Sequence, residues 1–152
     1  MESVANATGN YHMIEGNIPP HITVGMINSS DEERVITTFE QCVGRIHHGD
    51  IQIAGIGLFR KSSVYLQPVL NQYLHEISVK VNEAYEGLQA EHNRYTPFNW
   101  MPHISVAKRL MANEQLEAVK CLQEVGYPSA AKVSRIGLAK SNPYTDIRII
   151  TI

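Results

Sequence analysis

The sequence predicts an α+β fold of duplicated β-α-β-β units, and an internal repeat carries this prediction. Pro20-His21-Ile22-Thr23-Val24 resembles Pro102-His103-Ile104-Ser105-Val106, at an offset of 82 residues. Ile56-Gly57-Leu58 recurs as Ile136-Gly137-Leu138 at nearly the same offset. Segments with strand and helix patterns follow one another in the same order in both copies. Because a repeated supersecondary unit must bury its apolar face against another, the repeat favours two pseudo-symmetric lobes in one domain.

The first copy begins with a predicted strand over about 21–27, which carries the first histidine motif. Ser30 followed by Glu33 is a capping-box pattern and predicts the start of a helix. Apolar residues then recur at helical spacing: Val35, Ile36, Phe39, Val43 and Ile46. Two strands and the turn between them complete the copy: about 50–60, Arg60-Lys61-Ser62 and about 63–67.

The second copy repeats this order, starting with a predicted strand over about 103–109. Asn113 is the expected helix cap, and Gly126 is expected to end the helix. Its apolar stripe is formed by Leu116, Val119, Leu122 and Val125. Two strands and their turn again follow: about 131–140, Ser141-Asn142-Pro143 and about 145–152.

A long helix over about 68–88 is predicted between the copies, with Pro68 in its first turn. Its apolar face is Leu70, Leu74, Ile77, Val81, Ala84 and Leu88. Residues 89–100, which include His92 and Asn93, are predicted to form a loop. The whole chain, 1–152, is therefore expected to be a single domain with lobes over about 18–67 and 100–152.

The composition excludes several classes of protein. The 152 residues are 43% hydrophobic, which suits a packed core, and the net charge of −2 disfavours a protein that grips long nucleic acid. No apolar run approaches the roughly 20 residues that a bilayer requires. Two cysteines and no recognisable signal peptide favour a cytoplasmic protein with buried free thiols at Cys42 and Cys121.

Two histidines stand out from the other five because each belongs to the repeat. His21 and His103 each follow a proline, and each has a hydroxyl residue two positions later, Thr23 or Ser105. Residues i and i+2 of a strand share a face, so each histidine is expected to lie beside its hydroxyl. Two imidazoles can serve as general base and general acid, and hydroxyls can stabilise charge on phosphate oxygens. The alternative is that the repeat retains these residues for packing alone.

These motifs resemble those of the two-histidine (2H) phosphoesterases, which include the 2′-5′ RNA ligase-like proteins and cyclic phosphodiesterases. The resemblance rests on His21-Ile22-Thr23-Val24 and His103-Ile104-Ser105-Val106, and it extends over about 18–152. It implies a bilobal fold around a central cleft, a nucleotide or RNA-end substrate, and attack on 2′,3′-cyclic or 2′-5′ phosphodiester bonds without a metal or other cofactor. In that family, His21 and His103 would be catalytic, and Thr23 and Ser105 would bind phosphate. A non-catalytic module that binds a nucleotide or RNA end is the alternative.

The segment before the first motif departs from the family pattern. Family members begin with a strand and a long helix, whereas only 20 residues precede His21. Residues 2–10 fit only the tail of such a helix. An incomplete first lobe would expose a sheet edge, so we expect a homodimer that covers residues 1–20.

Other residues are weaker candidates. Arg109 is a candidate substrate-binding residue: it is four residues beyond Ser105, so an uninterrupted strand would bring it to the same face, within reach of a phosphate, with Lys108 pointing away. A solvated arginine at the strand end is the alternative. Four aromatic residues could stack on a base, although core packing is their commoner role: Tyr11, Tyr65, Phe98 and Trp100. His47-His48 beside Asp50 matches no standard ligand set, so no metal site is expected.

Overall fold

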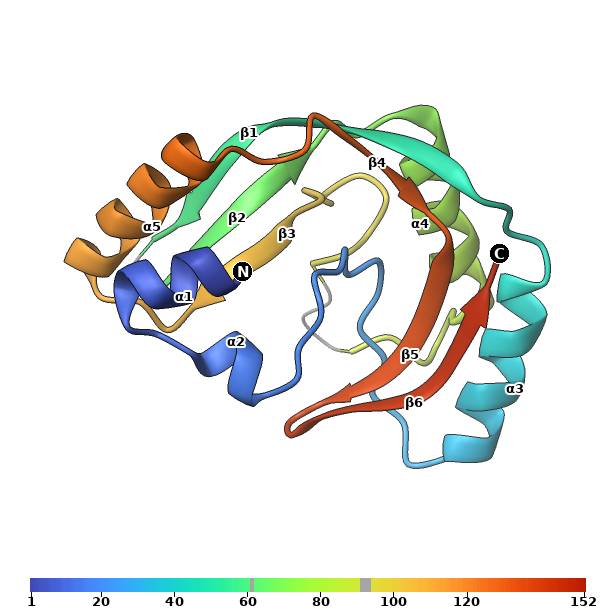
Figure 1. Ribbon diagram of the computed structural model, residues 1–152. Helices are drawn as coiled ribbons and strands as arrows, with labels where there is room; N and C mark the ends of the chain where they lie inside the picture. Colours follow the sequence, from blue (N-terminus) through green and yellow to red (C-terminus); the bar gives the residue numbers. More distant parts are fainter. Residues whose placement is uncertain (61, 91–93) are drawn as a thin grey trace. The chain divides into compact units, whose positions relative to one another are not determined.

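The computed structural model describes residues 1–60, 62–90 and 94–152, and it has the expected α+β architecture (Figure 1). The predicted turn residue Lys61 and the loop residues His92 and Asn93 lie outside these ranges. In chain order the elements are α1 (Glu2–Thr8), α2 (His12–Glu15), α3 (Glu32–Val43), β1 (Gly49–Phe59), β2 (Ser63–Pro68), α4 (Gln72–Ala84), β3 (Ile104–Lys108), α5 (Ala112–Val125), β4 (Ala130–Val133), β5 (Arg135–Ser141) and β6 (Tyr144–Thr151). Within the described ranges, no helix has the length and hydropathy that crossing a membrane would require.

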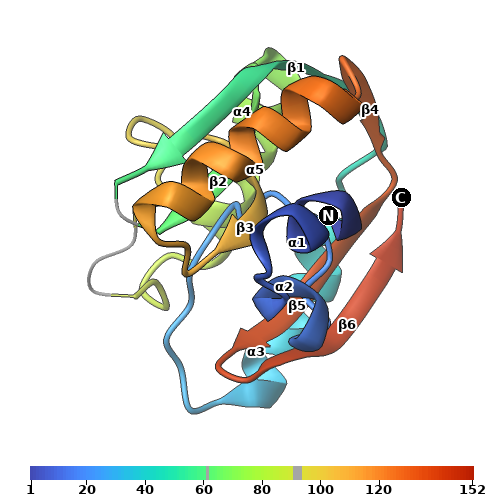
Figure 2. The ribbon, with the colours of Figure 1, turned by 60° about the vertical axis from the view of Figure 1, so that its left-hand side comes forward.

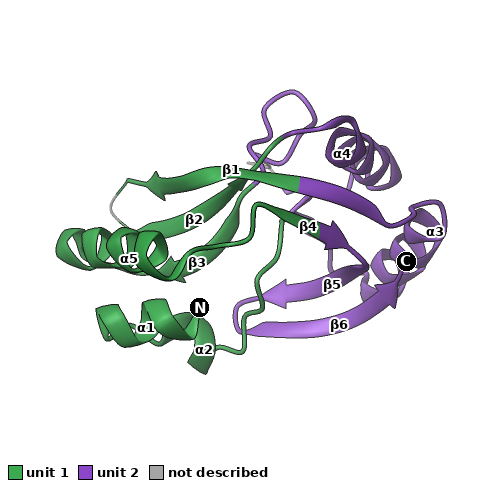
Figure 3. Cartoon of the chain, turned by 45° about the horizontal axis from the view of Figure 1, so that its top comes forward, with its two compact units in different colours: residues 1–22, 52–69, 103–131 green, residues 23–51, 70–102, 132–152 purple. Residues whose placement is uncertain are grey.

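The chain divides into two compact units that interleave along the sequence (Figure 3). Unit 1 comprises residues 1–22, 52–69 and 103–131, and unit 2 comprises residues 23–51, 70–102 and 132–152. Each copy of the repeat therefore contributes segments to both units. This partition differs from consecutive lobes over 18–67 and 100–152. The expected single domain and the expected homodimer stay predictions.

Unit 1 is built on antiparallel strands with helices packed against them (Figure 2). The four-stranded sheet has the order β3-β2-β1-β4, and both β1 and β3 pair antiparallel with β2. Val64 and Leu66 of β2 are buried, and α5 packs against this strand. Helix α1, with buried Val4 and Ala5, lies beside α5. The residues before His21 thus form two short helices, α1 and α2, and α1 is part of the core of unit 1.

Unit 2 packs α3 and α4 with the β5–β6 hairpin. Buried residues of α3, among them Phe39, meet Tyr85 and apolar residues of the hairpin such as Ile136. The Tyr85 hydroxyl donates a hydrogen bond to the Val35 carbonyl at 2.9 Å. Burial is the main cause that raises the pKa of Tyr85 to about 12. These contacts join α3, the end of α4 and the β5–β6 hairpin in the hydrophobic core of unit 2.

The predicted strand over 21–27 is wrong as a continuous element. Only two isolated antiparallel bridges occur in this segment, Ile22 with Ile104 and Ile27 with Gln89. By contrast, β3 begins directly after His103, and four of its residues, Ile104, Ser105, Ala107 and Lys108, pair with β2. A strand persists only where a neighbour satisfies its backbone groups, and residues 23–26 have no ladder partner among the described residues.

The predicted helix boundaries also require correction. Asp31, rather than Ser30, caps α3, because its carboxylate accepts a hydrogen bond from the Arg34 amide at 3.0 Å. Pro68 closes β2, so the central helix begins at Gln72, where Asn71 accepts a hydrogen bond from the Leu74 amide. The central helix therefore spans 72–84 rather than 68–88.

Helix α5 differs from its prediction at both its start and its face. It begins at Ala112, ahead of Asn113, and the Glu114 carboxylate accepts a hydrogen bond from the Met111 amide at 2.6 Å. Leu116 and Val125 are exposed, because the buried face runs along Ala118, Cys121 and Leu122 instead. Gly126, at φ 76°, ends the helix as expected.

The strands after the helices follow the prediction except for one break. β1 and β2 lie close to the expected 50–60 and 63–67. The expected strand over 131–140 is interrupted at Ser134, which separates β4 from β5. The two strands belong to different sheets: β4 pairs in the four-stranded sheet, and β5 pairs with β6. Cys42 and Cys121 are buried free thiols, as expected.

Candidate active site

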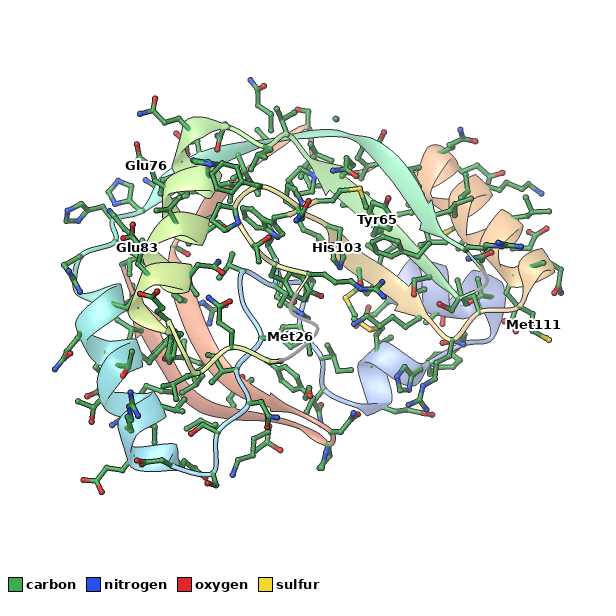
Figure 4. The ribbon with its side chains drawn as sticks, turned by 180° about the vertical axis from the view of Figure 1, so that it is seen from behind. Met26, Tyr65, Glu76, Glu83, His103 and Met111 are labelled. Carbon is green, nitrogen blue, oxygen red and sulfur yellow. The ribbon has the colours of Figure 1, made fainter. Side chains whose placement is uncertain are left out.

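The second histidine motif lies on one face of the unit 1 sheet. Tyr65 pairs with Ser105 on one side and with Gly57 on the other, so these three residues share a face. The His103 ring contacts the Tyr65 ring, with centroids 5.6 Å apart, so the imidazole lies on that same face (Figure 4). Val64 and Leu66 alternate to the opposite, buried face. The sheet therefore presents His103 and Ser105 together, as the spacing of the motif predicted.

The first histidine reaches the same sheet through one backbone bridge. Ile22 pairs antiparallel with Ile104, and this register sets His21 opposite Ser105. Ile104 shares its face with Leu66, so His21 falls on the face that carries His103. Both histidines are half-buried, and Ser105 is only 5% exposed. Two imidazoles and one hydroxyl thus belong to a single face of unit 1.

A hydrogen bond fixes how the His21 ring presents its nitrogens. Nδ1 of His21 lies 2.8 Å from the Pro19 carbonyl oxygen. A carbonyl can only accept, so Nδ1 carries a hydrogen and donates it. In the neutral ring with this tautomer, Nε2 is the nitrogen that carries the lone pair.

Thr23 begins unit 2 and is held there through its backbone. The Trp100 indole N–H donates to the Thr23 carbonyl oxygen at 3.0 Å, and Trp100 is only 6% exposed. Trp100 stands three residues before His103, so the segment that leads to the second motif supports the first. Thr23 is half-buried. The tryptophan supplies the positional support that a paired strand would otherwise give.

A β-bulge corrects the expected placement of Arg109. Tyr65 pairs with Ser105 but Val64 pairs with Ala107, so Val106 is an extra residue in β3. Beyond the bulge the alternation is shifted by one residue, and Lys108, opposite Ser63, returns to the face of Tyr65 and Ser105. No pattern in the sequence marks the bulge, so strand alternation alone predicts the wrong face for Lys108.

Arg109 lies outside the strand altogether. β3 ends at Lys108, and Arg109 has a φ of 60°. Its side chain is exposed, and its carbonyl accepts a hydrogen bond from the Asn10 side chain at 3.3 Å. The alternation that was expected to bring Arg109 beside Ser105 therefore does not reach it. Lys108 is the cation that the strand register brings to the site face.

The aromatic candidates fall into two groups by exposure. Tyr65 and Trp100 are each 6% exposed, so neither offers a ring face to a base. Phe98 is 93% exposed, and Tyr11 is partly exposed with its hydroxyl bonded to Asn6. Core packing is thus the role of the first pair.

In the described parts of the chain, no group of three or more His, Cys, Asp or Glu side chains lies close enough to hold a metal ion. His47 and His48 are exposed in the connection between α3 and β1, and Asp50 is exposed in β1.

The α+β fold and the two His-x-Thr/Ser motifs resemble those of the 2H phosphoesterases, and comparison with known proteins tests this resemblance. A family model described as the 2′-5′ RNA ligase superfamily matches residues 4–144. The chain therefore belongs to that superfamily, and the resemblance inferred from the two motifs is confirmed. No curated protein matches the chain.

Proposed function

We propose that the chain is a phosphodiesterase that cleaves 2′,3′-cyclic or 2′-5′ phosphodiester bonds of nucleotides or RNA ends. One observation supports the proposal: the strand register directs both repeat-related histidines to one face of the unit 1 sheet, with His21 opposite Ser105. Membership of the 2′-5′ RNA ligase superfamily supports the substrate class. The buried free thiols of Cys42 and Cys121 suit the reducing cytoplasm.

In the proposed reaction, one histidine acts as the base and the other as the acid. The neutral imidazole accepts a proton from water, whose oxygen forms the new bond to phosphorus. The bond from phosphorus to a ribose oxygen breaks, and the protonated imidazole donates its proton to that departing oxygen. The products are a phosphomonoester and a free ribose hydroxyl. The Nδ1 hydrogen bond of His21 to Pro19 supports proton transfer through Nε2.

In this proposal, hydrogen-bond donors and a cation stabilise the negative charge that develops on the phosphate. Ser105 and Thr23 hydroxyls donate hydrogen bonds to the non-bridging oxygens as negative charge builds up on them. Lys108 shares the strand face with Ser105, so its ammonium group supplies the positive charge near the phosphate. This assignment replaces Arg109 as the basic residue of the site.

The test is turnover of 2′,3′-cyclic nucleotides and 2′-5′-linked dinucleotides by the whole chain, with EDTA present and the products identified by chromatography. We expect cleavage to a phosphomonoester that survives chelation, with a bell-shaped dependence of rate on pH, since the two imidazoles must hold opposite protonation states. Loss of activity in EDTA, with recovery on adding a divalent ion, would contradict the proposed mechanism. Tight binding of the nucleotide without turnover would establish the non-catalytic module instead.

A further inference from the structure

Two aromatic rings pack against the imidazole of the second motif. The centroid of the His103 ring lies 4.8 Å from that of Phe59, in an edge-on arrangement with an interplanar angle of 87°. It lies 5.6 Å from that of Tyr65, at 65° (Figure 4). Phe59 and Tyr65 are themselves stacked, with centroids 4.4 Å apart. The three rings, all within unit 1, form one contiguous group, which we call the aromatic clamp.

A glycine opposite Tyr65 makes room for the clamp. Gly57 pairs with Tyr65 across β1 and β2, and a Cβ atom at Gly57 would overlap the tyrosine ring. The ring therefore lies flat across the glycine backbone instead of standing away from the sheet. Phe59, two residues after Gly57, then falls on the same face and stacks on the Tyr65 ring.

The burial of the clamp decides between two roles for its rings. Tyr65 is 6% exposed and Phe59 is half-buried, with one ring stacked on the other. A base needs an exposed ring face to stack on, so Tyr65 cannot serve as that platform. Both rings instead contact the side chain that transfers a proton in the proposed reaction. Their contacts restrict rotation of the imidazole, and an acid or base must be oriented within hydrogen-bond reach of the reacting atom.

We propose that Tyr65 and Phe59 are positioning residues that hold the His103 ring, and that Gly57 is the position that admits Tyr65. The structural part of this inference stands on ring contacts alone, whereas its kinetic part rests on the proposed function. The tyrosine hydroxyl is not part of the clamp, because both contacts are made by the ring. The clamp therefore requires an aromatic ring at position 65, and phenylalanine satisfies that requirement.

Unit 2 offers a matched control for the same kind of packing. Tyr73 of α4 lies against Gly49, where a Cβ atom would also overlap the ring, and its hydroxyl donates to the His47 carbonyl at 2.8 Å. No ring contact joins Tyr73 to His103 in the described part of the chain. Tyr73→Leu removes a tyrosine that covers a glycine without touching the clamp.

The first measurement is the nuclear Overhauser contact between the ring protons of Phe59 and His103, which requires no substrate. Gly57→Ala and Tyr65→Leu are expected to weaken it, whereas Tyr65→Phe and Tyr73→Leu should retain it. Thermal melts establish which variants are folded. If Tyr65→Leu does not fold, Gly57→Ala and Phe59→Leu carry the test, the latter through the contact between Tyr65 and His103. A folded Gly57→Ala or Tyr65→Leu variant with the full contact would overturn the proposal.

The second measurement separates kcat from KM. A misplaced imidazole should lower kcat by up to about 10²-fold and leave KM within about twofold, because proton transfer and not substrate binding is impaired. Tyr65→Phe should rescue kcat. A loss confined to KM would overturn the positioning role. If the wild-type chain has no turnover but the ring contacts respond as expected, the clamp stands and the proposed function fails.

Discussion

The two histidine motifs have nearly the same sequence, yet the chain holds them in different ways. In the second motif His103 directly precedes β3, and the following residues lie in β3, which is paired with β2 on both sides of the bulge at Val106. The first lies on an irregular segment that has one bridge at Ile22 and another at Ile27. Two hydrogen bonds outside any β-ladder hold this segment. The His21 ring donates to the nearby Pro19 carbonyl, and the Trp100 indole donates to the Thr23 carbonyl. A motif of alternating residues therefore specifies a strand only where the fold supplies a neighbour.

The largest loss of kcat should come from replacing the histidines, and it should be equal for the first and the second motif. His21→Ala and His103→Ala are each expected to lower kcat by at least ~10²–10⁴-fold, and the double variant should be little worse, because the pair acts as a unit. The measurement is cleavage of a 2′,3′-cyclic nucleotide alongside a thermal melt.

His48→Ala provides the control, since His48 is exposed and has no repeat partner. It should leave both turnover and the melting temperature unchanged. Unfolding of the His21 and His103 variants, or full activity in either, would assign the two histidines a structural role.

The hydroxyls should distinguish the two motifs. Ser105→Ala and Thr23→Ala are each expected to cost roughly 10-fold to 10³-fold in kcat, as one lost hydrogen bond to developing charge would. Ser105 should give the larger loss, because the paired strand orients its hydroxyl before substrate binds. Steady-state kinetics of both variants under one set of conditions measure the difference. A larger loss of kcat in Thr23→Ala than in Ser105→Ala would contradict the idea that pairing of β3 orients the Ser105 hydroxyl.

An effect of intermediate size, on KM, is expected from the residues that follow the bulge in β3. Lys108→Gln should raise KM about 10-fold, because the ammonium group lies on the site face and its charge favours phosphate binding. Arg109→Gln is the matched control, since it removes the same charge one residue beyond the strand and should change KM by less than about twofold. KM measured at two salt concentrations tests both variants. A dominant effect of Arg109 would contradict the register argument.

The smallest effect is expected at the support of the first motif. Trp100→Phe removes the donor to the Thr23 carbonyl and should lower the free energy of unfolding by about 1–3 kcal/mol. Amide hydrogen exchange should speed up in residues 22–24 and stay slow in β3, which serves as the internal reference. Equal acceleration in both segments would show a general loss of stability rather than a local one.

Much of this architecture can be predicted from the sequence, because hydrophobic periodicity specifies elements that pack in the ordinary way. β1, β2 and the buried stripe of α3 follow their patterns closely. The offset between the histidine motifs is also visible in the sequence alone. These features depend on local spacing, which the chain itself carries.

The remaining features depend on pairing between distant segments. The extra residue Val106 exists only relative to β2, so the exchange of Arg109 for Lys108 on the site face has no local signal. Likewise, Leu116 fits an apolar stripe, but the face of α5 that packs in unit 1 runs through Ala118 and Cys121. Such choices are made by tertiary contacts that override the local pattern.

Trp100 is the only tryptophan of the chain, and it is both buried and bonded to the backbone of the first motif. Its fluorescence therefore comes from a single known place. Emission from a buried indole lies at shorter wavelength than emission from a hydrated one. Any event that loosens residues 23–24 from Trp100 shifts the spectrum of the whole protein, without a label. The chain thus carries its own optical probe at the backbone of Thr23, and this probe offers a label-free readout for the nucleotide binding proposed above.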